Sequence, residues 1–206
     1  MTGRPSRPEA DKPYHHGALR GALLLAAEAE LEARGIEHFS LRKVAQRAGV
    51  SHGAPAYHFR DASGLLTALA TEGFARVLAI QHDCEERPGS SMSDRLVAVG
   101  LGYIDFARGH PALFRLMFNS QRPDFGNPDL QRQMDSTYRH LQAAIAAVDG
   151  AEADVVLAWA VVHGLAELML AGRLIWLQSL TPPEREAALV SMLRRVLPTG
   201  AVTPAC

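Results

Sequence analysis

The sequence predicts an all-α protein, and three observations lead to that prediction. Apolar residues recur every three or four positions along most of the chain, which is the period of a helix. Glycine, proline and capping residues divide these stretches into segments of helical length. No stretch alternates apolar and polar residues for long enough to indicate a β-strand. The segments form a three-helix N-terminal unit, followed by a long helix and an α-helical bundle.

We expect residues 1–16 to form a flexible arm, because they are polar, rich in arginine and proline, and lack the apolar core of a signal peptide. Arg4, Arg7 and Lys12 in this arm either contact DNA phosphates or are solvated, and the sequence favours neither. A first helix is expected at 18–34. Its predicted inward residues are Leu19, Leu23, Ala26, Ala27 and Leu31.

Residues 40–59 are the most informative segment. Ser40 is suited to cap a helix whose apolar face comprises Leu41, Val44, Ala45 and Ala48. Gly49 ends that helix, since a positive φ is cheap only for glycine, and Ser51 is expected to cap the next. Two short helices joined by a tight turn form a helix-turn-helix, whose second helix can enter the DNA major groove. The segment therefore predicts a DNA-binding unit.

The candidate DNA contacts come from both helices of this segment. The second helix presents Ser51, His52, Gly53, Ala54, Ala56, Tyr57 and His58. Gly53 and Ala54 allow a close approach to base edges, and an alanine methyl group can touch a thymine methyl group. Tyr57 is as suited to packing as to a hydrogen bond, whereas His58 is better suited to anchoring the helix. The preceding helix adds Ser40, Arg42, Lys43 and Arg47 as phosphate or base-edge contacts.

A long fourth helix is expected after Asp61, which is suited to cap it. Its apolar face is expected to comprise Leu65, Leu69, Phe74, Val77 and Leu78. Residues 88–91 break the chain. A helix at 94–108 then presents Leu96, Val99, Tyr103, Phe106 and Ala107, and Pro111 opens a short helix that ends near Phe118.

Residues 122–126 are expected to form a loop. Asn127 caps the next helix and Pro128 takes its first position; the apolar face there comprises Leu130, Met134, Tyr138, Leu141, Ile145 and Val148. Thr181 and Glu184 have the spacing of a capping box for the last helix. That helix presents Leu189, Leu193, Val196 and Leu197.

Residues 155–177 are apolar enough and long enough to cross a bilayer. However, the stretch contains His163, Glu167 and Arg173, and each charge near the centre of a span costs about 2.5–3.5 kcal/mol. A helix that is apolar nearly all round is typical of a buried element. We therefore expect the central helix of a bundle and no membrane association.

The net charge of −1 conceals an asymmetry along the chain. Residues 1–60 hold nine Arg and Lys against six Asp and Glu, a net of +3, which leaves −4 for the remainder. A basic front fits nucleic acid at one end, although chance scatter of charge gives the same pattern. Cys84 and Cys206 are far apart and lack metal-ligand spacing, so neither a disulfide framework nor a metal site is expected.

The sequence contains no recognisable catalytic set. His82 and Cys84 are close along the chain but point apart on a helix, and no phosphate loop or metal cluster is present. His52 and His58 are six positions apart and do not share a helix face. We expect no enzymatic activity and no cofactor.

The N-terminal unit also carries a family resemblance. Its pattern comprises Ala26-Ala27, Gly35, Ser40-Leu41, Val44-Ala45, Ala48-Gly49-Val50-Ser51, Gly53, His58-Phe59 and Leu65-Leu66. In order and spacing, residues 17–77 resemble the DNA-binding domain of the TetR/AcrR family of bacterial transcriptional repressors. Three residues bear on DNA affinity: Pro55 in the first turn of the second helix, Ala56 in place of a tyrosine, and Ala62 in place of a lysine. Pro55 removes one backbone N–H, the phosphate contact of the tyrosine either shifts to Tyr57 or weakens, and one backbone contact is expected to be missing at Ala62, so the sequence leaves open whether DNA binding is weakened.

A second resemblance covers the C-terminal region. The segment Ala158-Trp159-Ala-Val-Val-His163-Gly164-Leu-Ala166, with His110-Pro111 and Leu116-Met117-Phe118 upstream, resembles the Trp-His-Gly type of TetR C-terminal domain. The resemblance implies an effector-binding and dimerisation domain over residues 88–197, followed by a tail at 198–206. It also implies a cytoplasmic homodimer that binds an inverted-repeat operator, represses transcription, and is released by an unidentified small molecule.

In such a dimer the last two long helices of each subunit form a four-helix interface. The small residues that would allow a close approach are Ala160, Gly164, Ala171 and Gly172. The alternative is that both helices pack within one subunit.

The candidate effector pocket is a mostly apolar set, which is the usual balance in ligand pockets. It comprises Tyr103, Phe106, Phe114, Met117, Phe118, Tyr138, Trp159, His163 and Met169. Each of these residues is equally suited to an ordinary core. His163 and Glu167, four positions apart, form either a buried pair, an anchor for an effector or an interface contact. The alternative function is a DNA-binding regulator without an effector, controlled by a protein partner or by abundance.

Overall fold

The structure is a computed structural model that describes residues 16–86 and 91–198. Every regular element in these two ranges is a helix, which confirms the predicted all-α class. The bounds are α1 (His16–Arg34), a 3-10 turn η1 (Ile36–His38), α2 (Leu41–Ala48), α3 (Ala54–Phe59), α4 (Ala62–Glu85), α5 (Met92–Gly109), α6 (Pro111–Asn119), α7 (Pro128–Ala146), α8 (Glu152–Leu170), α9 (Ile175–Ser179) and α10 (Pro182–Val196). The arginines and Lys12 of the expected arm lie outside the described residues, as does most of the expected tail.

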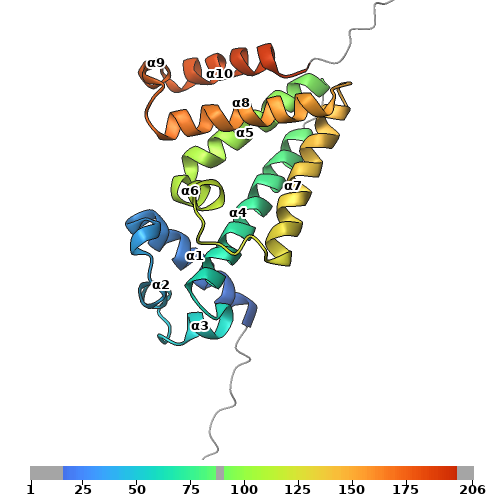
Figure 1. Cartoon of the computed structure of the whole chain (residues 1–206). Coiled ribbons are helices and arrows are strands. Elements are labelled where there is room, and N and C mark those ends of the chain that lie inside the picture. Colours follow the sequence, from blue (N-terminus) through green and yellow to red (C-terminus); the bar gives the residue numbers. More distant parts are fainter. Residues whose placement is uncertain (1–15, 87–90, 199–206) are drawn as a thin grey trace, which may run out of the picture.

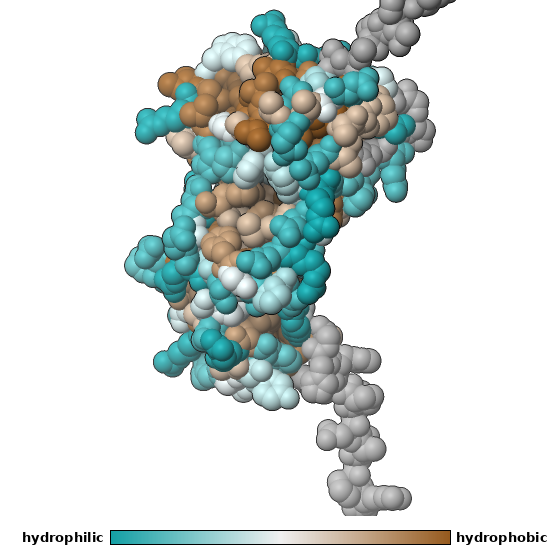
Figure 2. Space-filling model, turned by 45° about the vertical axis from the view of Figure 1, so that its right-hand side comes forward, coloured by the Kyte–Doolittle hydropathy of each residue, from teal (hydrophilic) through white to brown (hydrophobic). Residues whose placement is uncertain are grey.

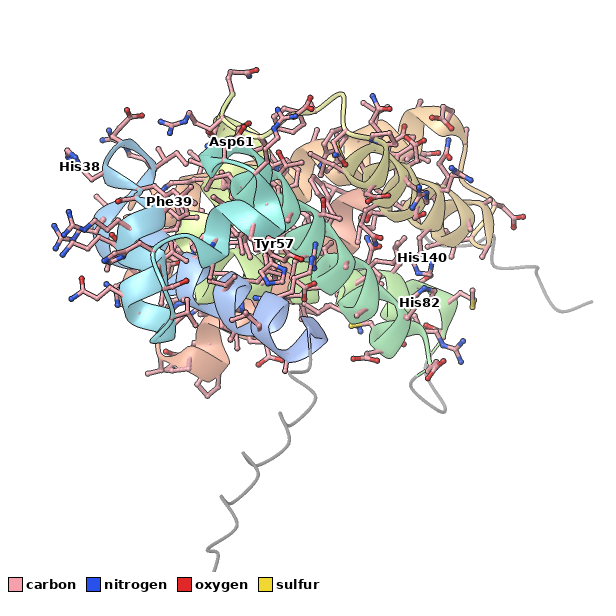
Figure 3. All side chains as sticks on the ribbon, turned by 90° about the horizontal axis from the view of Figure 1, so that it is seen from below. His38, Phe39, Tyr57, Asp61, His82 and His140 are labelled. Atoms are coloured by element: carbon pink, nitrogen blue, oxygen red, sulfur yellow. The ribbon has the colours of Figure 1, made fainter. Side chains whose placement is uncertain are left out.

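The helices form two parts that α4 connects. Helices α1 to α3 make up an N-terminal head at one end, and α5 to α10 make up the bundle at the other (Figure 1). Helix α4 packs against α1 and α3 in the head and against α5, α6 and α7 in the bundle. On its bundle half, His82 faces His140 of α7 with ring centroids 4.2 Å apart (Figure 3). The central helix of the fold is therefore α4.

Residues 155–177 do not form the single central helix that we expected. Helix α8 ends at Leu170, and the chain turns at Gly172, which has φ +67°, before α9 begins. One face of α8 packs on α5, α7 and α10, but Leu157 and Leu168 are exposed on the other. We expected α8 to be buried all round because it is apolar on every face. In the fold, the other helices cover only one face of α8.

Two helices in the described ranges, over residues 62–84 and 152–170, are long and apolar enough to span a bilayer. The first is the central helix of the fold, with 44% of its most apolar window buried, and 22% of the second is buried. Length and composition alone are weak evidence for a membrane span, because core helices share both properties.

One apolar core runs from the head into the bundle. Leu23 and Leu66 belong to it at the head end, and Leu113, Ile145 and Leu193 belong to it in the bundle. Almost all predicted inward residues are buried or packed against this core. The continuity matters because side chains in close-packed contact transmit a displacement from the bundle to the head.

The predicted capping residues place most helix starts correctly. The Asp61 carboxylate accepts from the Gly64 N–H at 2.8 Å, and Asn127 Oδ1 accepts from the Asp129 N–H at 3.0 Å. The Glu184 carboxylate accepts from the Thr181 N–H at 2.9 Å. Ser40 has the extended backbone of an N-cap, but its side chain makes no capping hydrogen bond.

Candidate nucleic-acid interface and internal cavity

Gly49 forms the turn between the two helices of the head as predicted. It has φ +67° and ψ +31°, and the following Val50 N–H donates to the Ala45 carbonyl at 3.0 Å. The next helix starts later than expected. Gly53, not Ser51, is the N-cap of α3, and the Ser51 carbonyl accepts from the Ala54 N–H at 3.0 Å within the turn. Residues 51–53 are therefore an exposed turn that leads into α3.

Pro55 fits this later start without distorting the helix. Because α3 begins at Ala54, the proline lies within the first two positions, where a backbone N–H has no partner inside the helix. Pro55 and Phe59 are buried and hold α3 against the rest of the head.

The remaining side chains of α3 form an exposed face. Ala56 is exposed and Tyr57 is 80% exposed, so Tyr57 is not a core aromatic. The Tyr57 ring lies edge-on to His58, with centroids 5.3 Å apart. His58 is half-buried, as an anchoring residue would be. Figure 3 views the molecule from this end, with Tyr57 labelled.

The three basic residues of α2 are all exposed but have different partners. Arg42 and Lys43 are exposed, and Lys43 Nζ donates to Gln46 Oε1 at 3.3 Å. Arg47 Nε instead donates at 2.7 Å to the carboxylate of Glu30, whose side chain is 2% exposed. Arg47 therefore ties α2 to α1, and it is the pairing partner that a buried carboxylate requires.

Two cations of the head were missed by the sequence reasoning. Arg60 follows α3 with φ +69°, and its side chain is 93% exposed. Arg20 of α1 lies over the ring of Phe59, 5.2 Å from its centroid. The position of Arg60 directly after α3 was a usable clue, whereas the position of Arg20 beside α3 depends on how the helices pack.

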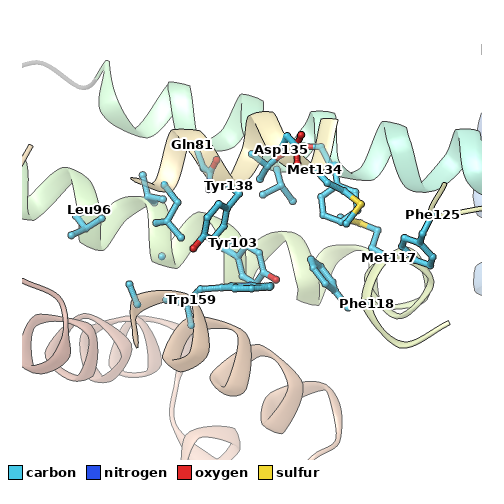
Figure 4. Close-up of a pocket in the computed structure, with 18 of the residues that line it drawn as sticks. Gln81, Leu96, Tyr103, Met117, Phe118, Phe125, Met134, Asp135, Tyr138 and Trp159 are labelled. Carbon is cyan, nitrogen blue, oxygen red and sulfur yellow. Dashed lines mark hydrogen bonds between the residues drawn. The ribbon is translucent and has the colours of Figure 1, made fainter. Parts of the chain in front are cut away.

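The bundle contains a mostly apolar cavity of about 570 Å³. Its wall comes from α4, α5, α6, α7, α8 and the loop before α7 (Figure 4). It is lined by Phe74, Val77, Gln81, Leu96, Val99, Gly100, Tyr103, Met117, Phe118, Ser120, Gln121, Phe125, Met134, Asp135, Thr137, Tyr138, Leu141, Ala158, Trp159, Val162 and Leu197.

The structure divides the candidate pocket residues into two groups. Those that line this cavity are Tyr103, Met117, Phe118, Tyr138 and Trp159. Those outside its wall are Phe106, Phe114, His163 and Met169. Sequence reasoning missed Gln81 and Asp135, because only the packing of α4 against α7 brings these two helices to one cavity.

His163 supports the wall from behind. Its Nδ1 lies 2.9 Å from the hydroxyl of Tyr103, and its Nε2 lies 3.9 Å from Glu167 Oε1. Burial lowers the pKa of His163, although Glu167 opposes that shift, and burial raises the pKa of Tyr103. A neutral imidazole with its proton toward Glu167 leaves Nδ1 to accept from Tyr103. His163 and Glu167 are not the buried pair that was one of the expected alternatives, because their side chains are 26% and 31% exposed and Glu167 accepts from Asn119 Nδ2 at 2.9 Å.

Helix α6 connects the cavity to the head. Met117 and Phe118 on α6 line the cavity. At the other end of this helix, the Ala112 N–H donates at 3.0 Å to Glu32 of α1. Just before it, His110 Nδ1 lies 2.8 Å from Glu28 Oε1, also on α1. A displacement of α6 therefore acts directly on the first helix of the head.

The end of the molecule away from the head carries exposed apolar side chains (Figure 2). From α8 and α9 they are Val156, Leu157, Trp159, Leu168, Ile175 and Trp176. The space where a Gly164 side chain would lie is open. The apolar face of α10 is covered, unlike that of α8. Leu189 and Leu193 are buried, because α10 packs on α5 and α8 of the same chain.

Within the described ranges, no three His, Cys, Asp or Glu side chains lie close enough to hold a metal ion. Buried Cys84 contacts the Ala98 carbonyl, with its sulfur 3.4 Å from that oxygen.

Comparison with protein families matches both parts of the chain. The family of bacterial regulatory proteins named tetR matches residues 23–69, and the tetracyclin repressor-like C-terminal domain matches residues 96–196. The chain belongs to the TetR family. It is therefore a transcriptional regulator, and the predicted family is confirmed.

Individual relatives agree with this assignment. The TetR-family chain is 30% identical over 137 residues to the HTH-type transcriptional regulator BetI of Cronobacter sakazakii, covering 66% of this chain and 67% of BetI. A solved Rhodococcus sp. RHA1 protein of unknown function is 34% identical, with a TM-score of 0.72 over 92% of this chain and all of that one.

A second similar structure is that of a TetR variant from Acinetobacter baumannii in complex with minocycline. It is 20% identical with a TM-score of 0.57, over 85% of this chain and 92% of that one, and shows the shared fold alone.

Proposed function

We propose that this TetR-family regulator is a cytoplasmic homodimeric repressor that a small molecule releases from an inverted-repeat operator. The observation that carries the proposal is the cavity of about 570 Å³ whose wall includes α4 and α6. Its volume falls within the roughly 300–1,000 Å³ of ligand sites, and both helices also contact the head. Solved with minocycline, the Acinetobacter neighbour has a ligand bound to a chain of the same fold.

The proposed DNA-binding domain covers residues 17–77. Its reading surface is the turn at 51–53 and the exposed face of α3, which carries Tyr57. Arg42 and Lys43 of α2 and Arg60 after α3 supply phosphate contacts, because their side chains are exposed cations next to that face.

The proposed dimerisation surface is the uncovered face of α8, within a C-terminal domain over residues 88–197. Contiguous exposed apolar side chains of this kind mark interaction sites. Leu157, Gly164 and Leu168 are spaced so that they share one helix face, and the open space at Gly164 allows a partner helix to approach closely. A two-fold dimer presents its α3 helices to successive major grooves about 34–36 Å apart.

Release follows from a shift between two dimer states. A ligand that fills the cavity contacts Met117 and Phe118, and α6 transmits its displacement through Ala112 to Glu32 of α1. The ligand then favours a spacing of the two heads that fits DNA poorly. The operator and the ligand must weaken each other equally, with a coupling typically of about 1–3 kcal/mol.

The first experiment selects binding sites from random duplex DNA with the purified full chain. An enriched inverted repeat supports the dimeric operator, and no enrichment at low salt contradicts it. Screening a chemical library for release of that operator then tests the effector. Release by none of the compounds would favour the alternative regulator without an effector, controlled by a partner or by abundance.

A further inference from the structure

The cavity holds a buried acceptor that the protein leaves unpaired. Gln81 lies near the end of α4, lines the cavity and is 5% exposed. Its Oε1 is buried and has no hydrogen-bond partner among the described residues. An unpaired amide oxygen in such a place is costly, and most buried polar atoms have a partner. Because Gln81 is part of the cavity wall, a bound molecule with a donor beside this amide would supply the missing partner.

The hydroxyl groups of the cavity wall are already engaged within the protein. The Tyr103 hydroxyl pairs with His163, and the Tyr138 hydroxyl donates to Glu152 at 2.9 Å. Thr137 Oγ1 lies within hydrogen-bond distance of two backbone carbonyls, those of Phe74 and Gln133. Gln81 differs from these residues because its acceptor is free for a ligand.

Within the described part of the chain, the wall has acceptors and one negative charge but no cation. No Lys, Arg or His is among the described residues that line the cavity, and Asp135 of α7 contributes a carboxylate at the exposed edge. Figure 4 shows Gln81, Tyr138 and Asp135 on one side of the cavity, facing Tyr103 and Trp159 on the other. An anionic ligand would find no counter-charge among these lining residues, because the cation beside them, Arg139, is paired with Asp135 at 3.7 Å.

We infer that the ligand is an apolar molecule with a hydrogen-bond donor and no negative charge, such as an alcohol or an amine, whose donor binds Gln81 Oε1. The inference rests on the proposed function, because it names the class of molecule that the cavity takes. It also explains how binding reaches the head, since Gln81 and the head-contacting residues Leu65 and Leu66 belong to the same helix.

The test uses three probes of equal chain length: octanol, octylammonium and octanoate. Each is titrated calorimetrically into the full-length protein. Octanol and octylammonium are expected to bind, with octanoate at least tenfold weaker. Gln81→Leu is expected to weaken octanol binding on the order of tenfold, because one hydrogen bond is lost. It is also expected to raise the Tm of the free protein, because the unpaired acceptor is gone.

Two further variants make the result specific. Gln81→Glu should strengthen octylammonium binding relative to octanol, because it places a carboxylate at the donor's partner position. Gln131→Leu is the matched control: Gln131 is exposed on α7 outside the cavity wall, so neither probe affinity should change. Operator binding and helix content check that each variant folds. If Gln81→Leu does not fold, Gln81→Glu tests the same contact independently.

Three results would overturn the inference: octanoate binding as tightly as octanol, unchanged octanol affinity in Gln81→Leu, or no binding of any probe. Operator release by some other compound would then leave the proposed function standing. Failure of every compound, whatever its charge, to release the operator would instead count against the proposed function itself.

Discussion

Glu28 of α1 and His110 at the start of α6 meet across the junction of head and bundle, with Oε1 and Nδ1 2.8 Å apart although 82 positions separate them. Arg76 of α4 joins the same carboxylate, with Nη1 2.8 Å from Glu28 Oε2. One side chain of the head thus pairs with both helices that lead from the cavity. The Glu28 side chain is 12% exposed, so solvent screens these contacts only partly.

Replacing Glu28 should therefore weaken the junction. Glu28→Gln removes the charge that pairs with Arg76 and His110, and we expect a loss of about 1–3 kcal/mol in the free energy of unfolding. Urea denaturation measures it. Glu37→Gln is the matched control, because Glu37 is exposed on η1. Equal stability of the two variants would show that the junction contributes little.

Tyr57 should act in DNA binding and not in stability. Tyr57→Phe keeps the ring against His58 and removes a hydroxyl group that is free to reach a phosphate. We expect operator affinity to fall on the order of tenfold, because a hydrogen bond to a charged group is lost, with Tm unchanged. Fluorescence anisotropy at fixed salt measures the affinity, and wild-type affinity would exclude a hydroxyl contact.

Arg42 and Arg47 should behave differently although both lie on α2. Arg42→Ala should lower operator affinity and reduce the slope of log K against log salt by about 0.9, as for one lost phosphate contact. Arg47→Ala should instead cost about 1–3 kcal/mol of stability, because it leaves the buried Glu30 unpaired. A salt titration and a denaturation curve on both variants separate the roles, and identical behaviour would refute the distinction.

A charge on the uncovered face of α8 should separate the proposed dimer. Leu168 is 44% exposed, and Leu168→Glu would place a carboxylate in the middle of an apolar interface. Sedimentation analysis should then find monomers. Leu25→Glu is the control, since Leu25 is a 66% exposed leucine on the distant α1. A dimer that survives Leu168→Glu places the interface elsewhere.

His163 should make stability depend on pH. Burial lowers the pKa of His163 in the folded state, so the unfolded chain binds its proton more readily, with Glu167 partly opposing the effect. Stability is then full above the unfolded pKa of about 6.5 and falls as the pH drops through the folded pKa. His163→Asn, whose amide oxygen can still accept from Tyr103, should flatten the curve of unfolding free energy against pH. An unchanged curve would exclude His163 as the source.

Local chemistry determined much of what the sequence predicted. The turn at Gly49, the caps at Asp61 and Asn127 and the length of α4 depend on neighbours within a few positions. The family pattern over the head could also be recognised from the sequence, because it consists of the order and spacing of residues along the chain. The later start of α3 was missed because Ser51 and Gly53 are both acceptable N-caps and packing chose between them.

Only the tertiary structure decided where these helices meet. Periodicity shows that a helix has an apolar face but does not say what covers it, so α8 was expected at the centre and lies at the edge, with Leu168 exposed. Likewise Arg47 is paired with Glu30, and Gln81 lines a cavity with residues more than fifty positions away. These contacts join residues that are distant in the chain. Their energies depend on how deeply the side chains are buried, which the local sequence does not show.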